Sequence, residues 1–241
     1  EYEVFLNADR TAVPKLKNYE TVVIDAQYFS KKDIRKLHAG GTKFTAILIL
    51  ALSKISGHII KHTSIWQSGI MKTGKRKNGL MLRIKLAGIY GYISRKIKEK
   101  GSGWLFIDNC DVYDYAHKKD IFDGLTVILK KIRAMGKPVV VNGGDIYVTA
   151  YQSCYGSAAD IMTGVNQESG GAGLIYNQNI PYAEKNGAGV FLPVSAGIKA
   201  DGMDVYLLEY TTDHKLIRRI KKYCRKKKYD YYIADSLELG I

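Results

Sequence analysis

Acidic and amide side chains in this sequence gather in three short groups that could do acid–base chemistry. The groups are Phe106–Tyr113 with Asp108 and Asp111, Asn142-Gly-Gly-Asp145, and Asn166-Gln-Glu168. Two carboxyl groups can cleave a glycosidic bond when one protonates the leaving oxygen and the other acts as nucleophile or as base for water. Amides can hydrogen-bond to sugar hydroxyls, and aromatic rings can stack on sugar rings. The residue types therefore favour sugar chemistry.

Each of these groups directly follows a short apolar run. The runs with the polar residues that end them are Glu3–Leu6 with Asn7, Thr21–Ile24 with Asp25, Trp104–Ile107 with Asp108, Pro138–Val141 with Asn142, Ile161–Val165 with Asn166, Val205–Leu208 with Glu209, and Tyr231–Ala234 with Asp235. Phe44–Leu52 is a further run that could supply an eighth strand. Eight strands in a chain of 241 residues predict an α/β fold, a single (β/α)8 TIM-type barrel over 1–241. In that fold the strand ends converge on one active-site mouth.

Helical patterns lie between the apolar runs. They predict helices at Lys31–Ala39, Asp120–Met135 and His214–Lys228. Ser30 with Asp33 predicts a capping box at the first of them. Gly136 and Pro138 predict where the second one stops.

The net charge of +14 is confined to one part of the chain. Fourteen Lys and Arg and no acid lie between Asp33 and Glu99, whereas the rest holds 23 basic and 23 acidic residues. A polyanion-binding surface usually spreads its basic residues over several elements, so we do not expect a nucleic-acid partner. With 46% hydrophobic and 25% charged residues, the composition excludes collagen and wholesale disorder and allows one sizeable core.

Further features concern membrane spans, disulfides, metal ligands and the start of the chain. No apolar run is long enough to span a bilayer. Three cysteines without CxxC spacing allow at most one disulfide, and no metal-ligand cluster is visible, so we expect neither a metal nor a cofactor. The chain begins at Glu1 rather than Met, and we expect that its natural start is missing, so that a signal peptide is neither shown nor excluded.

The motifs resemble one known family when taken together. Phe-Ile-Asp108-Asn-x-Asp111, Asn142-Gly-Gly, Asn-Gln-Glu168-Ser and Leu-Glu209-Tyr210 are similar to segments of the endo-α-1,4-polygalactosaminidase-related glycoside hydrolases (family 114 and relatives). The match covers about 1–42, 93–169 and 200–241 in the right order. The resemblance implies a (β/α)8-barrel glycosidase, extracellular or attached to the cell surface, that acts as a monomer on a galactosamine-containing polysaccharide of bacterial or fungal origin.

The resemblance also implies roles for individual residues. It implies Asp108, at the end of the fourth strand, and Glu168, at the end of the sixth, as the catalytic pair, without assigning which is the acid. Residues expected to bind the sugar are Asp25, Tyr28, Asn109, Asp111, Tyr113, Asn142, Asp145, Gln167, Glu209, Tyr210 and Asp235.

Two segments, about 43–92 and 170–199, depart from the family pattern. The first should hold a third strand with a Tyr-Leu-Asn-Ile-Gly-like sequence, and the second an amphipathic helix. Codons can be chosen for Lys43–Leu50 so that a frame shifted by one base reads Val-Tyr-Ser-Tyr-Leu-Asn-Ile. We hypothesise that both segments are family sequence in a shifted frame, which resequencing the DNA would test. The barrel would then be imperfect at its third strand and sixth helix.

Two other functions stay open. The basic segment over 43–98 could be a real surface that binds an anionic glycan or nucleic acid, with steeply salt-dependent affinity and no bond cleavage. Alternatively, the barrel could bind carbohydrate without cleaving it.

Overall fold

The structure is a computed structural model that describes residues 2–42, 44–49, 101, 103–108, 110–113, 117–168 and 197–241. Its centre is an eight-stranded sheet in which every neighbouring pair of strands is parallel and the order follows the sequence. The strands are β1 (Tyr2–Phe5), β2 (Thr21–Ile24), β3 (Phe44–Ile49), β4 (Trp104–Ile107), β5 (Val139–Asn142), β6 (Gly164–Glu168), β7 (Asp204–Tyr210) and β8 (Asp230–Ala234). The predicted alternation of parallel strands and helices is confirmed.

The third strand is formed by the segment that departs from the family pattern. The backbone of β3 pairs in parallel with β2 on one side and with β4 on the other. The eighth apolar run therefore does supply a strand, as its composition predicts. The remainder of 43–92, and 170–196, lie outside the described residues, so the shifted-frame hypothesis stays a prediction.

The two edge strands, β1 and β8, lie next to each other. Beyond them, the Asn7 amide donates a hydrogen bond of 3.3 Å to the carbonyl of Leu239 in the C-terminal tail. Within the described chain no β-ladder joins β1 to β8, so the predicted closed barrel is confirmed in its strands and their order but not in ring closure.

The two faces of the sheet bury different side chains because neighbouring residues of a strand point to opposite faces. One cluster lies on the concave, inner face and draws on six of the strands and the C-terminal tail: Tyr2, Val4, Val23, Phe106, Val140, Tyr206, Leu208, Ala234 and Leu239. The alternate residues of the same strands pack outward against helices. This alternation decides which residues at the carboxyl ends of the strands point to the inner face, where the predicted active-site mouth lies.

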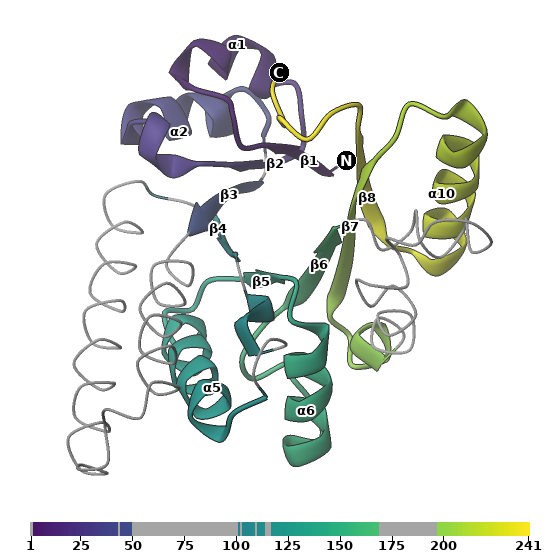
Figure 1. The fold of residues 1–241 in the computed structure, drawn as a ribbon. Helices are drawn as coiled ribbons and strands as arrows, with labels where there is room; N and C mark the ends of the chain where they lie inside the picture. Colours follow the sequence, from purple (N-terminus) through teal and green to yellow (C-terminus); the bar gives the residue numbers. More distant parts are fainter. Residues whose placement is uncertain are drawn as a thin grey trace, which may run out of the picture.

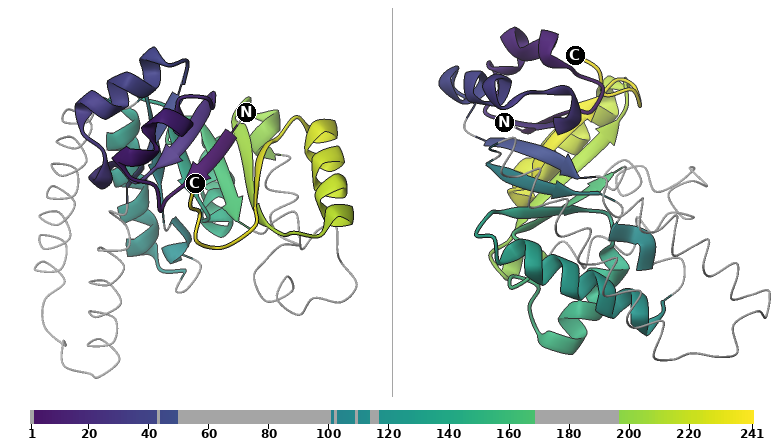
Figure 2. Two further views of the ribbon diagram at one scale, coloured as in Figure 1. Left: turned by 90° about the horizontal axis from the view of Figure 1, so that it is seen from above. Right: turned by 90° about the vertical axis from the view of Figure 1, so that its left-hand side faces the viewer.

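Helices cover the outer face of the sheet (Figure 1). They are α1 (Val13–Leu16), α2 (Lys31–Ala39), α5 (Lys119–Arg133), α6 (Asp145–Tyr155) and α10 (His214–Lys227), with short 3-10 turns η1 (Arg10–Ala12), η2 (Ala26–Tyr28) and η3 (Cys110–Tyr113). In the right-hand view of Figure 2, α1 and α2 (purple) lie above the strands and α5 and α6 (teal and green) lie below them, because the outer face curves around the sheet. None of the helices in the described ranges is both long and apolar enough to cross a membrane.

The predicted helices agree with the structure within a residue or two at most ends. Both bonds of the capping box between Ser30 and Asp33 are present at the start of α2. No helix was predicted where the structure has α6, which begins at Asp145 directly after the glycine turn. Of the expected sixth helix, only 197–200 falls within the described residues, and it is helical.

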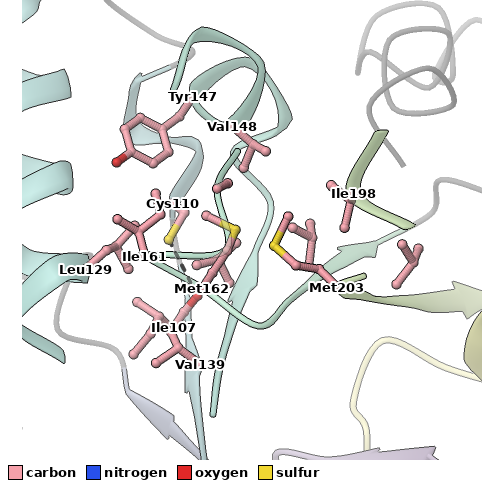
Figure 3. Close-up of a cluster of buried hydrophobic side chains, with 14 of the residues drawn as sticks. Ile107, Cys110, Leu129, Val139, Tyr147, Val148, Ile161, Met162, Ile198 and Met203 are labelled. Carbon is pink, nitrogen blue, oxygen red and sulfur yellow. Dashed lines mark hydrogen bonds between the residues drawn. The ribbon is translucent and has the colours of Figure 1, made fainter. Parts of the chain in front are cut away.

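The largest buried cluster joins β4–β7 to α5, α6 and α10. Figure 3 shows Cys110 and Met162 in the middle of this cluster, with Ile107 and Val139 of the strands below them, Leu129 of α5 beside them and Tyr147 of α6 above. Cys110 and Cys224 are buried and Cys154 is exposed, and all three cysteines are free. None of them forms the single disulfide that the count would allow.

Gly144 fixes the turn that joins β5 to α6. Its φ is +79°, and a Cβ there would lie 2.7 Å from the carbonyl oxygen of Cys110 in η3. At Gly144 the backbone therefore closely approaches the backbone of η3. The turn therefore holds the β5 end beside the residues that follow β4.

Gly144→Ala should destabilise the protein by about 2–5 kcal/mol, since the left-handed backbone costs about 1–2 kcal/mol and the clash with a backbone atom adds about 1–3 kcal/mol. Gly136→Ala is the matched control, because Gly136 has φ +73° but open space around it. It should cost only about 1–2 kcal/mol. Urea unfolding of both variants measures the difference; equal losses would show that the close approach to Cys110 carries no energy.

Candidate functional site

One amide group joins the two carboxylates expected to be catalytic. The Nδ2 atom of Asn142 donates to Oδ1 of Asp108 over 2.9 Å and to Oε1 of Glu168 over 2.8 Å. These residues come from β5, from the residue after β4 and from the last residue of β6. Three neighbouring parallel strands thus end in side chains that meet at the same edge of the sheet.

The shared donor limits how far apart the carboxyl groups can be. The two accepting oxygens can be no farther apart than the sum of the two bonds, about 5.7 Å. Glu168 is exposed and Asp108 is partly exposed, so both can be reached from solvent. The pair is therefore close enough and open enough to act on one bond of a bound molecule.

Tyr210, the last residue of β7, contacts the same pair. Its hydroxyl donates to Oε2 of Glu168 over 3.2 Å. Burial raises the pKa of Tyr210 well above its usual range, and the charge of Glu168 raises it further. The phenol therefore keeps its proton at neutral pH and stays a donor to the carboxylate.

Two residues behind the pair complete the network, and neither was among our expected site residues. Nδ2 of Asn166 donates to Oδ1 of Asn142 over 2.6 Å, and the hydroxyl of Tyr2 donates to Oδ1 of Asn166 over 3.0 Å. Both residues are buried, on β6 and β1. Asn166 lies two positions before Glu168 and hence on the same strand face, a parity signal that could have selected it over Gln167.

Asp25 shares the inner side of its strand with Val23, again by parity. Its carboxylate accepts two hydrogen bonds from Gln27, from the backbone amide at 3.0 Å and from Nε2 at 2.6 Å. Tyr28, in the following turn, is about half exposed (52%). Asp235 is exposed just after β8. The structure shows no bond between these three residues and the Asp108–Glu168 pair among the contacts it describes.

Four other expected sugar-binding residues point elsewhere. Tyr113 packs against Phe122 and Tyr147 beneath η3. Asp145 is buried as the first residue of α6, where its carboxylate accepts a bond from the Ile146 amide. Gln167 and Glu209 alternate with inner-face residues of β6 and β7, so they lie on the side of the helices, and Glu209 is fully buried. Asn109 and the side chain of Asp111 lie outside the described residues.

The described residues contain no group of three or more His, Cys, Asp or Glu side chains that could hold a metal ion. The chemistry available at the strand ends is that of two carboxyl groups, two amides and a protonated phenol. This set can donate and accept protons, form an ester with a bound carbon centre and hydrogen-bond to hydroxyl groups.

No protein-family model matches the chain, and no curated protein matches it by sequence. Solved structures do resemble it. The glycoside hydrolase domain of PelA from Pseudomonas aeruginosa has a TM-score of 0.61, and a variant of that domain 0.62; each is 14% identical and the match covers 100% of this chain and 96% of theirs. A GH18 chitinase from Pseudoalteromonas aurantia has a TM-score of 0.56 at 10% identity, with 97% of this chain and 93% of that one covered. The chain therefore resembles these glycoside hydrolase structures in fold, although no ladder closes its parallel sheet into a ring within the described residues.

Proposed function

We propose that this chain is a glycoside hydrolase that uses Asp108 and Glu168 as its catalytic pair and cuts within a galactosamine-containing polysaccharide. The observation that carries the proposal is the Asn142 amide at the end of β5, which binds one oxygen of each carboxylate at the ends of the two flanking strands, β4 and β6. In TIM-barrel enzymes catalytic residues come from the carboxyl ends of different strands, as these do. The fold shared with glycoside hydrolase domains is consistent with this role.

The proposed reaction has two steps. One carboxylate attacks the anomeric carbon while the other carboxyl group protonates the leaving oxygen, so that the glycosidic bond breaks and an ester forms. Water, deprotonated by the second group, then attacks the same carbon and releases the first carboxylate. A separation of about 5–5.5 Å is typical of this retaining route, whereas inverting enzymes need about 6.5–9.5 Å. The limit of about 5.7 Å between the bonded oxygens supports retention.

The charge of the strand ends supports an amino sugar. Asp25, Asp108 and Glu168 place three carboxyl groups on the inner side of this edge. An unacetylated galactosamine unit carries a positive charge at neutral pH and would be attracted to such a mouth. The resemblance of the sequence motifs points to the same class of substrate.

The test is hydrolysis of defined α-1,4-linked galactosamine oligosaccharides, followed by mass spectrometry of the products and proton NMR of the first-formed anomer. We expect internal cleavage and products that keep the α configuration. Products of β configuration would contradict retention but not hydrolysis. Binding without any cleavage would favour the non-catalytic carbohydrate-binding barrel.

A further inference from the structure

We propose that Tyr2 and Asn166 are positioning residues that hold the Asn142 amide in the one orientation in which it serves both carboxylates. This inference rests on the proposed function, because it assigns a task within the same site. Neither residue is bonded to Asp108 or Glu168 in the described contacts; each acts through the next residue in a chain of hydrogen bonds that runs from β1 to β6 and then to β5.

The side-chain amide of Asn142 could adopt two orientations that differ by half a turn. In the observed one the NH2 group faces the carboxylates and the carbonyl oxygen faces Asn166. A rotation of half a turn would aim the carbonyl oxygen at two carboxylates and remove both of their bonds from this amide. An amide is nearly symmetrical in shape, so packing alone selects weakly between the two settings, and hydrogen-bond partners decide.

Asn166 makes this selection because it presents a donor to Asn142. Its own amide could also rotate, and the bond that the hydroxyl of Tyr2 donates to Oδ1 stabilises the orientation that leaves Nδ2 for Asn142. Burial raises the pKa of Tyr2 well above its usual range, with smaller effects from Tyr206 and then Glu168, so the phenol remains a donor. Asn166 is fully buried, so water does not compete for its amide.

The ring of Tyr2 packs beside that of Tyr206, which provides a matched control. The two rings lie 4.8 Å apart and both are 3% exposed. Asp204, whose charge raises the pKa of Tyr206 further after burial, lies at the opposite end of β7 from Tyr210. Both rings belong to the same buried cluster, but among the described contacts the hydroxyl of Tyr2, and not that of Tyr206, is bonded to Asn166.

The experiment compares Tyr2→Phe, Asn166→Asp and the control Tyr206→Phe in the full chain. Tyr2→Phe should lower kcat about tenfold with KM within about twofold, because the reacting groups lose order while the sugar contacts stay. Asn166→Asp should lower kcat about 100-fold at neutral pH, since an ionised carboxylate cannot donate and drives the Asn142 amide to rotate. Tyr206→Phe should keep kcat within about twofold, because it removes a hydroxyl from the same buried cluster without touching the bond to Asn166.

A pH profile separates positioning from a general loss of structure. The carboxyl group introduced by Asn166→Asp can donate to Asn142 again once it is protonated, so this variant should regain kcat as the pH falls, relative to the wild-type chain. A kcat for Tyr2→Phe that equals that of Tyr206→Phe, or an Asn166→Asp variant that is equally impaired at every pH, would overturn the proposal.

The side-chain amide signal of Asn142 in a proton–nitrogen NMR spectrum tests the same point without catalysis. The wild-type signal should be protected from exchange, and Asn166→Asp should abolish the protection. If the wild-type chain cleaves no oligosaccharide, the proposed function fails while this signal still decides the positioning role. If cleavage occurs and the signal is the same in both proteins, only the positioning role fails.

Discussion

Asp108→Asn and Glu168→Gln are each expected to lower kcat by about 10²–10⁴-fold while the protein stays folded. An amide of the same shape can still accept a hydrogen bond from Asn142, which in the structure binds an oxygen of each residue. It can neither attack an anomeric carbon nor give a proton to a leaving oxygen. Initial rates on a galactosamine oligosaccharide, with thermal unfolding of the same samples, measure both effects.

Asp123→Asn is the matched control for these two variants. Asp123 lies on α5 and pairs with Lys119 at 2.9 Å on the protein surface. Its loss should leave kcat within about twofold, because an exposed ion pair contributes little to stability and nothing to the strand ends. Full activity in Asp108→Asn or in Glu168→Gln would remove that residue from the catalytic pair. Unchanged sugar binding in both, without any wild-type cleavage, would support a carbohydrate-binding barrel.

The positions of the strand ends could be predicted from the sequence, because two independent features mark each of them. A short apolar run such as Trp104–Ile107 predicts a buried strand, and the polar residue after it predicts the edge where side chains meet. This rule predicted Asp108, Asn142 and the group Asn166-Gln-Glu168 at the strand ends, and the family resemblance then implied Asp108 and Glu168 as the catalytic pair. The structure does bring Asp108, Asn142 and Glu168 together. The helix predicted over Asp120–Met135 buries Leu125 and Leu129, which lie four residues apart and so share one face.

The face on which each residue lies was harder to predict. Glu209 and Gln167 follow the apolar runs as closely as the bonded residues do, but strand alternation turns them toward the helices. The signal was available, because Tyr210 is two residues beyond Leu208, which packs on the inner face. A rule based on the first polar residue of each run ignores this parity.

Other features depend on contacts between distant parts of the chain. From the sequence alone Tyr2 looks like any strand residue; the structure shows that its hydroxyl contacts Asn166, which is 164 positions away. Gly144 looks like any turn residue, and its close contact with η3 is visible only in the structure. β3 was doubtful from sequence because its segment departs from the family pattern, yet an apolar run between two strands suffices to pair with both.

Asn142→Asp should lower kcat by about 10²–10³-fold and destabilise the protein in a way that depends on pH. The new carboxyl group would lie within about 3 Å of two others and would lose both donated bonds. Like charges at that distance raise the pKa of the introduced group above its value of about 3.9 in the unfolded chain. Between these two values the folded state binds more protons than the unfolded state does, so stability falls as the pH rises. The loss relative to wild type should be small near pH 4 and reach about 2–4 kcal/mol at pH 7.

Asn142→Leu provides the uncharged comparison, since leucine has a similar volume and no polar atoms. It also removes the shared donor, and it leaves Nδ2 of Asn166 without its partner. We expect a comparable loss of kcat but a loss of stability that changes less between pH 4 and pH 7. Urea unfolding at the two pH values measures this contrast. Equal pH slopes for both variants would show that the carboxylates are not close enough to repel the introduced charge, and the separation that supports retention would then be wrong.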